Sequence, residues 1–78
     1  MEIRIIRIEQ LNPALERWWI QLPRAGFRDF GFLLETLEGT GLHKRSREAE
    51  NLMEVDVAVG MKTELEALIS ALQVNPDF

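Results

Sequence analysis

The clearest hydrophobic pattern runs through residues 27–37, where apolar side chains recur at the spacing of one helix face. Its five members are Phe27, Phe30, Leu33, Leu34 and Leu37. Gly39 and Gly41 follow, and a glycine just past the last turn commonly ends a helix. Alternation through 30–34 would also suit a strand, but the glycines and the length of the pattern favour an amphipathic helix. Gly31 inside it costs about 1 kcal/mol relative to alanine, which a close approach of the helix to a sheet would explain.

A second pattern, of period two, covers Leu52–Val59. Met53, Val55, Val57 and Val59 alternate with Glu54, Asp56 and Ala58. Such alternation predicts an antiparallel strand with one buried and one solvated face. We expect the valines to face inward and Gly60 to end the strand.

The C-terminal pattern is helical again and predicts a helix over 64–73. Leu65, Leu68, Ile69 and Leu72 form an apolar stripe. Thr63 and Glu66 have the spacing of a capping box, in which each side chain satisfies a free backbone N–H group. Asn75-Pro76 is expected to stop the helix.

The N-terminal segment Ile3–Ile8 is rich in β-branched residues and predicts a strand. Its alternation is broken, because Ile3 and Ile5 point one way and Ile6 and Ile8 the other. Either a bulge lies near 5–6, or both faces meet apolar surface. The polar stretch Leu42–Glu48 predicts a short, charged edge strand.

Residues 13–22 allow two interpretations. Asn12-Pro13 can start a helix, since Leu15, Trp18 and Leu22 then fall at helical spacing. Alternatively, Asn-Pro forms a turn, and 17–22 returns as a strand beside the first. The β-branched and aromatic content favours the strand, and the helix remains the alternative.

These elements predict an α+β fold in a single domain spanning residues 1–78. Two amphipathic helices would cover one face of an antiparallel sheet, as in the two-layer sandwich of ferredoxin-like domains. That plan normally ends with a strand beside the first, but the chain has no candidate after 73. The strand at residues 2–9 would take this place, which gives a circularly permuted ββαββα order. If 13–22 is helical, the order becomes βααββα.

The segment WIQLPRAGFRDFGFLLETLEGTGL, followed by MEVDVAVG and a short helix, resembles the ACT-like domains. The closest similarity is to short, uncharacterised bacterial ACT-like proteins, over about residues 17–73. ACT domains bind amino acids or other small ligands at dimer interfaces and regulate a partner. The resemblance implies that Gly26 is the loop glycine that lets a ligand approach the backbone. Leu22 and Pro23 stand where ACT domains have an acidic residue. The resemblance therefore does not extend to the recognition of an amino-acid ammonium group.

Composition narrows the function classes. The 78 residues carry a net charge of −4, which argues against non-specific nucleic-acid binding. The N-terminal segment has neither the form of a signal peptide nor that of a membrane span. With no cysteine and one histidine, we expect no metal site and no cofactor, and the cysteine count fits a cytoplasmic protein. No nucleophile can be placed with a base and an orienting group, so we expect no enzyme.

The candidate ligand site is the loop and helix start formed by Arg24, Ala25, Gly26, Phe27 and Arg28. Backbone N–H groups at a helix N-terminus attract anions, and two arginines would add charge. A basic run at His43, Lys44, Arg45 and Arg47 could also contact a phosphate or an acidic partner. The loop could instead be an ordinary strand-to-helix connection with solvated arginines. The basic run could instead be a charged edge strand. Glu48, Glu50, Glu54 and Asp56 are expected to be a solvated surface rather than a cation site.

Trp18 and Trp19 suggest an interface. In a strand, adjacent side chains point to opposite faces, so one tryptophan fills the core and the other, Trp19, lies on the uncovered face. We expect Ile3 and Ile5 nearby, forming an exposed apolar patch that packs against a second copy. The sequence therefore predicts a homodimeric, non-catalytic ligand-binding or regulatory module. The alternative is a protein–protein interaction or assembly subunit with no small-molecule ligand.

Overall fold

The computed structural model describes residues 1–37 and 40–74. Its elements are, in chain order, β1 (Arg4–Asn12), β2 (Leu15–Gln21), η1 (Arg24–Gly26), α1 (Phe27–Glu35), β3 (Thr40–Arg45), β4 (Leu52–Ala58), η2 (Val59–Met61) and α2 (Lys62–Val74). The turns η1 and η2 are single 3₁₀ turns that lead into the helices. The strand interpretation of residues 17–22 is therefore correct, and the helical alternative is not observed.

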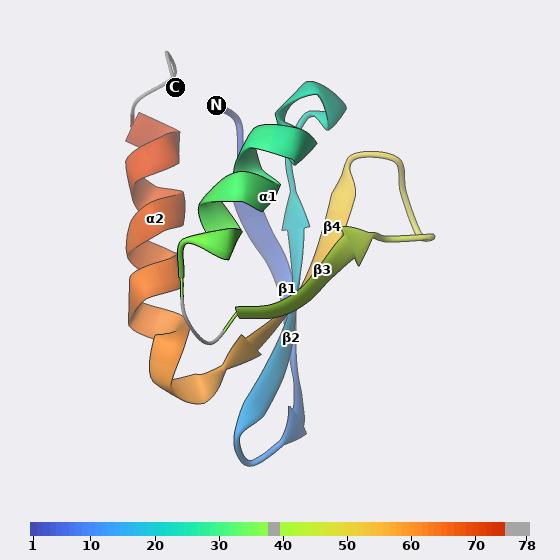
Figure 1. Ribbon diagram of the computed structural model, residues 1–78. Coiled ribbons are helices and arrows are strands. Elements are labelled where there is room, and N and C mark those ends of the chain that lie inside the picture. Colours follow the sequence, from blue (N-terminus) through green and yellow to red (C-terminus); the bar gives the residue numbers. More distant parts are fainter. Residues whose placement is uncertain (38–39, 75–78) are drawn as a thin grey trace.

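The strands form one antiparallel four-stranded sheet in the order β1-β2-β4-β3. Figure 1 shows α1 and α2 side by side over one face of this sheet, while the other face carries no helix. The fold is thus a two-layer α+β arrangement, compatible with a ferredoxin-like sandwich. β1 and β3 are the two edge strands.

The core lies between the helices and the covered face of the sheet. Its fully buried side chains are Trp18, Ile20, Leu22, Phe30, Leu34, Val55, Val57, Leu65 and Leu72. Leu37 and Leu68, which we expected in this layer, are partly buried and pack against it. The apolar faces of the two helices therefore pack against the apolar face of β4, as predicted.

Two expectations near the end of β4 are wrong. Val59 is 39% exposed, because the strand ends at Ala58 and the chain enters η2 one residue before Gly60. Thr63 does not cap the second helix, since α2 already begins at Lys62. The expected stops at Gly39 and Asn75-Pro76 lie outside the described residues.

The first strand contains the predicted bulge. Its register with β2 shifts between Ile5 and Arg7, and again between Gln10 and Asn12. Ile5 lies opposite Ile20 and packs against the core, whereas Ile8 lies opposite Trp18 at the open flank of the same face. The extra residue explains why the isoleucines break a strict alternation.

Gly31 marks the close approach of α1 to β3. A Cβ atom placed on this glycine would lie 3.1 Å from Cε1 of His43. A glycine here lets the imidazole pack directly against the helix, which accounts for a residue that is otherwise unfavourable in a helix.

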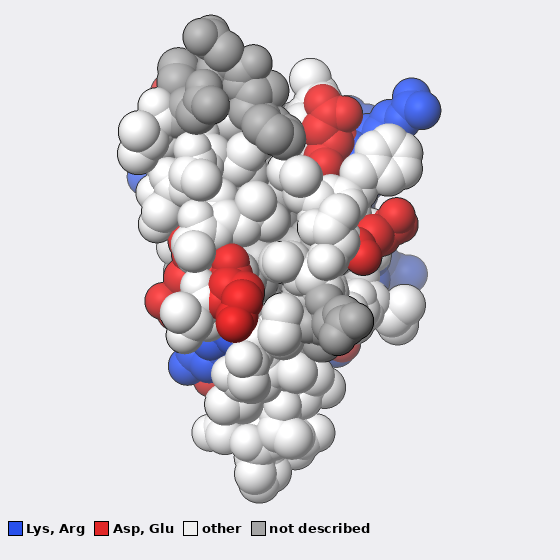
Figure 2. All heavy atoms as spheres, turned by 60° about the vertical axis from the view of Figure 1, so that its left-hand side comes forward, with Lys and Arg blue, Asp and Glu red and all other residues white. Residues whose placement is uncertain are grey.

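Among residues 1–37 and 40–74, no helix has the length and apolar character needed to cross a bilayer. Figure 2, with α2 turned forward, shows an uncharged surface interrupted by acidic patches, and basic side chains only near its margins.

Candidate functional site: an arginine-lined pocket

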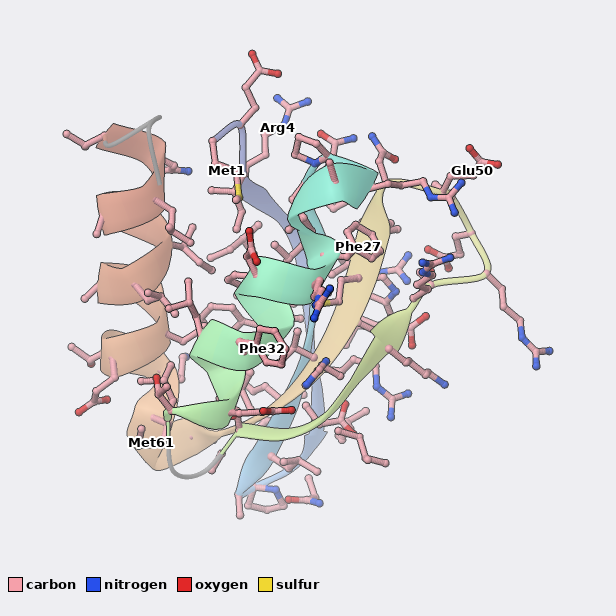
Figure 3. All side chains as sticks on the ribbon, turned by 45° about the horizontal axis from the view of Figure 1, so that its top comes forward. Met1, Arg4, Phe27, Phe32, Glu50 and Met61 are labelled. Carbon is pink, nitrogen blue, oxygen red and sulfur yellow. The ribbon has the colours of Figure 1, made fainter. Side chains whose placement is uncertain are left out.

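The two basic features of the sequence meet at one end of the molecule. Arg24 in η1, Arg45 at the end of β3 and Arg47 just beyond it line a pocket of about 420 Å³. The β3–β4 connection completes it with Ser46, Glu48, Ala49 and Glu50. Figure 3 shows Glu50 on this connection and Phe27 on α1 at the same end of the molecule. We call this site the arginine pocket.

Ser46 shapes the wall of the arginine pocket. It is buried, its backbone N–H donates to the Leu52 carbonyl at 2.8 Å, and its hydroxyl accepts the Glu48 N–H at 3.1 Å. Such a side-chain turn fixes the backbone of a short connection. The loop that carries Arg47 and Glu50 is thereby anchored to the end of the sheet.

The charges of the arginine pocket are unevenly matched. Arg24 lies 3.9 Å from Glu50, which is 87% exposed, and Glu48 is paired with Arg7 at 3.1 Å. Within residues 1–37 and 40–74, Arg45 and Arg47 have no carboxylate within 4.0 Å. Arg45 instead lies 5.8 Å from the ring centre of Phe27. These two arginines are therefore without a carboxylate partner among the described residues, and guanidinium forks suit carboxylates and phosphates.

Backbone N–H groups of the predicted ligand loop already donate hydrogen bonds within the loop. In η1, the Gly26 N–H donates to the Pro23 carbonyl at 2.9 Å, and the Phe27 N–H donates to the carbonyl of Arg24. These bonds satisfy amides that would otherwise face an anion at the start of α1. The side chain of Arg24, rather than the helix N-terminus, is what this loop offers a ligand.

The other predicted loop residues do not gather at one site. Gly26 is buried, and a Cβ there would lie 3.0 Å from Cε of Met1, so this glycine packs against the residue that begins the chain segment before β1. Phe27 belongs to the core, Ala25 is exposed, and Arg28 lies 5.6 Å from the ring centre of Phe32 on the surface of α1. Only Arg24 of the five lines the arginine pocket.

The acidic residues at 48–56 are spread over separate partners. Glu48 binds Arg7, and the Asp56 carboxylate accepts two hydrogen bonds from Arg17, at 2.8 and 3.3 Å. The hydrogen bond to Asp56, with its charge, raises the pKa of Arg17. No group of three or more metal-ligating side chains occurs within the described ranges.

A partly buried edge of the core holds a further polar cluster that the sequence did not indicate. Glu16 accepts the indole N–H of Trp18 at 3.0 Å and the Lys62 ammonium at 3.2 Å. The hydrogen bond from Trp18 lowers the pKa of Glu16, and the hydrogen bond and charge of Lys62 lower it further. Burial has the opposite, smaller effect. The cluster ties β2 to the start of α2 and has no access to the arginine pocket, so we assign it a structural role.

The uncovered face of the sheet differs from the predicted interface. Trp19 points to this face, but it is only 6% exposed. The guanidinium of Arg7 lies 3.8 Å from its ring centre and covers part of it. Ile3 is 3% exposed within the core and Ile5 packs against the core, so neither lies beside Trp19. The three predicted interface residues therefore do not form one exposed patch.

Another hollow, of about 570 Å³, lies between the N-terminal segment and the ends of β2 and α2. Several of the polar groups that line it already bond to one another or to the backbone. Arg4 donates to Gln21 at 2.8 Å, Gln73 donates to the Ile3 carbonyl at 2.7 Å, and the Asn51 carbonyl accepts the Leu22 N–H at 2.9 Å. These bonds leave the arginine pocket as the better candidate for a charged ligand.

Comparison of the chain with models of known families, with curated proteins and with solved structures finds no match.

Proposed function

We propose that the protein is a small, non-catalytic ligand-binding module of ACT-like type that binds an anionic small molecule and regulates a partner chain. The observation that carries this proposal is the convergence of Arg24, Arg45 and Arg47 on the arginine pocket. Carboxylates and phosphates are the anions that such guanidinium groups hold best.

The strand order supports the ACT-like part of the proposal. In β1-β2-β4-β3, the central strands β2 and β4 are flanked by β1 and β3. A ferredoxin-like domain gives this order when its last strand is moved to the start of the chain and hairpins onto the next strand. We propose that the fold is this permuted form, with residues 17–73 as its common part. The lack of cysteine accords with a cytoplasmic location, which forms part of the same proposal.

A thermal-shift and calorimetric series with phosphate, citrate, amino acids and nucleotides tests the binding function. A ligand at one hundred times its dissociation constant should stabilise the fold by about 2.7 kcal/mol. The paired changes Arg45→Gln and Arg47→Gln should abolish the shift. Arg28→Gln is the matched control, because Arg28 lies on Phe32 outside the pocket.

The alternative is an assembly subunit without a small ligand, which the exposed edge of β1 favours. In that case no anion in the series shifts the unfolding temperature, and the protein still self-associates. We propose self-association under both functions, because so small a core gains stability from a second copy.

A further inference from the structure

We propose that two copies of the chain join through the edge of β1, in one antiparallel register centred on Ile8, to form a continuous eight-stranded sheet. This inference refines the proposed self-association and does not depend on ligand binding at the arginine pocket. It rests on three properties of β1: its exposed apolar side chains, the face of the sheet to which each side chain points, and the positions of its charged residues.

The edge of β1 is apolar and open. The strand pairs only with β2, so the hydrogen-bonding groups of its other edge have no strand partner in the described chain. Ile6, Ile8 and Leu11 are 49%, 43% and 43% exposed. An exposed edge with apolar side chains is a ready template for a further strand.

The two bulges of β1 limit where such a ladder can form. They interrupt the strand around Ile6 and Leu11 and leave residues 7–10 as the regular segment. Bulges usually protect an edge from pairing. Here they restrict pairing to a short segment and thereby favour a closed pair of chains over a long stack.

The facing of the regular segment follows from its pairing with β2. Ile8 lies opposite the buried Trp18 and thus on the helix-covered side, whereas Arg7 lies opposite Trp19 and Glu9 opposite Arg17 on the uncovered side. Residues directly opposite each other in an antiparallel pair share a face. A two-fold axis at Ile8 therefore sets Ile8 against itself and Arg7 against the partner's Glu9, twice.

The other registers are less favourable. An axis at Arg7 or at Glu9 sets like charges directly opposite each other, which is destabilising. An axis at Ile6 or Gln10 sets a charged residue opposite an apolar one. The axis at Ile8 alone buries the exposed isoleucine against itself and also pairs opposite charges.

Arg7 retains the capacity for this second contact. Only its Nη2 is engaged, with the two oxygens of Glu48 at 3.1 and 3.3 Å, and its side chain is 46% exposed. A guanidinium has five N–H donors. Its stacking on Trp19 keeps it on the uncovered side of the sheet, the same side on which the partner's Glu9 would lie.

The opposite edge of the sheet offers no comparable match. β3 carries His43, Lys44 and Arg45 and no acidic residue. Two copies paired through β3 would bring basic groups together, so the charge order favours the edge of β1.

Complementary charge variants test the register. In R7E, two glutamates face two glutamates across the axis, and in E9R, two arginines face two arginines. Each should weaken self-association in sedimentation equilibrium about tenfold or more. A mixture of R7E and E9R should form a heterodimer as stable as the wild-type dimer, because every facing pair is then opposite in charge. Glu66→Arg, on the exposed face of α2, is the control and should leave the dimer unchanged.

Because Arg7 also covers Trp19, R7E is at risk of not folding, and I8K provides a second test. It places two ammonium groups on the axis and should give a folded monomer. A wild-type chain that stays monomeric at millimolar concentration overturns the proposal, as does a dimer that survives both E9R and I8K. Glu9 does not line the arginine pocket, so monomeric E9R that still binds an anion separates this interface from the ligand function.

Discussion

The guanidinium carbon of Arg7 lies 3.8 Å from the centre of the Trp19 ring, on the face of the sheet that no helix covers. This contact helps to cover a large aromatic side chain, which is only 6% exposed although no helix lies over it. Arg7 is itself held by Glu48 from the β3–β4 connection. Arg7 therefore links β1 to β2 and to the β3–β4 connection across the uncovered face.

Replacing Arg7 by alanine should lower the free energy of unfolding by about 1 kcal/mol, since a cation–π contact at a partly exposed site is worth about 0.5–1 kcal/mol and the alkyl stem is lost as well. Urea denaturation of dilute protein measures it. Arg28→Ala is the control, because its guanidinium lies 5.6 Å from the exposed Phe32 and should contribute far less. Equal losses for both variants would contradict this account.

Glu16 should make stability depend on pH. Its hydrogen bond from Trp18, and then Lys62, lower its pKa in the folded chain below the ordinary value of 4.5. The carboxylate therefore contributes stability that is fully present above the unfolded pKa and is lost as pH falls through the lower, folded value. Glu16→Gln should be less stable than wild type at pH 7, and this difference should shrink towards pH 3 in urea titrations. A constant difference across that range would exclude the assigned role, and Glu66→Gln serves as the control.

Gly31 and His43 should be energetically coupled. Gly31→Ala gains about 1 kcal/mol of helix propensity, but its Cβ would lie 3.1 Å from the imidazole. In the His43→Ala background this tight contact is gone, so the same change should stabilise the chain more. A double-mutant cycle measured by thermal unfolding gives the coupling. Additive effects would show that the imidazole moves away without cost.

Val57 and Val59 form a matched pair two residues apart. Val57 is fully buried, and its change to alanine should cost about 2 kcal/mol through lost burial and a cavity. Val59 is 39% exposed in η2, and the same change should cost no more than about 0.5 kcal/mol. Chemical denaturation of both variants checks the boundary of β4. A large loss at Val59 would place it back in the core.

The core could be predicted from the sequence because its apolar residues recur at the regular spacing of a helix or a strand. The helical stripe through Phe30 and Leu34 and the alternation through Val55 and Val57 each have a face to bury, and the two faces meet. At Val59 the prediction failed because a period-two pattern carries no signal for the residue at which the backbone leaves the strand. Thr63 failed likewise, since η2 starts the helix earlier than its capping pattern indicates.

The arginine pocket could be predicted only in pieces. Arg24 and the basic run at Arg45 and Arg47 were each recognisable, but their meeting depends on where η1 turns and how Ser46 anchors the connection. The burial of Trp19 was not foreseeable, because the stacking of Arg7 needs the bulge at Ile6 and the exact pairing of β1 with β2.

The placement of adjacent tryptophans on opposite faces provides two optical reporters in one strand. Trp18 is fully buried with its indole N–H bound to Glu16, whereas Trp19 lies beneath a guanidinium with its indole N–H unpaired within the described chain. Trp18→Phe leaves a fluorophore that senses the bare side of the sheet, and Trp19→Phe leaves one that senses the helix layer. Emission from these two single-tryptophan chains would show whether both sides of the sheet loosen together or in sequence when the molecule is heated.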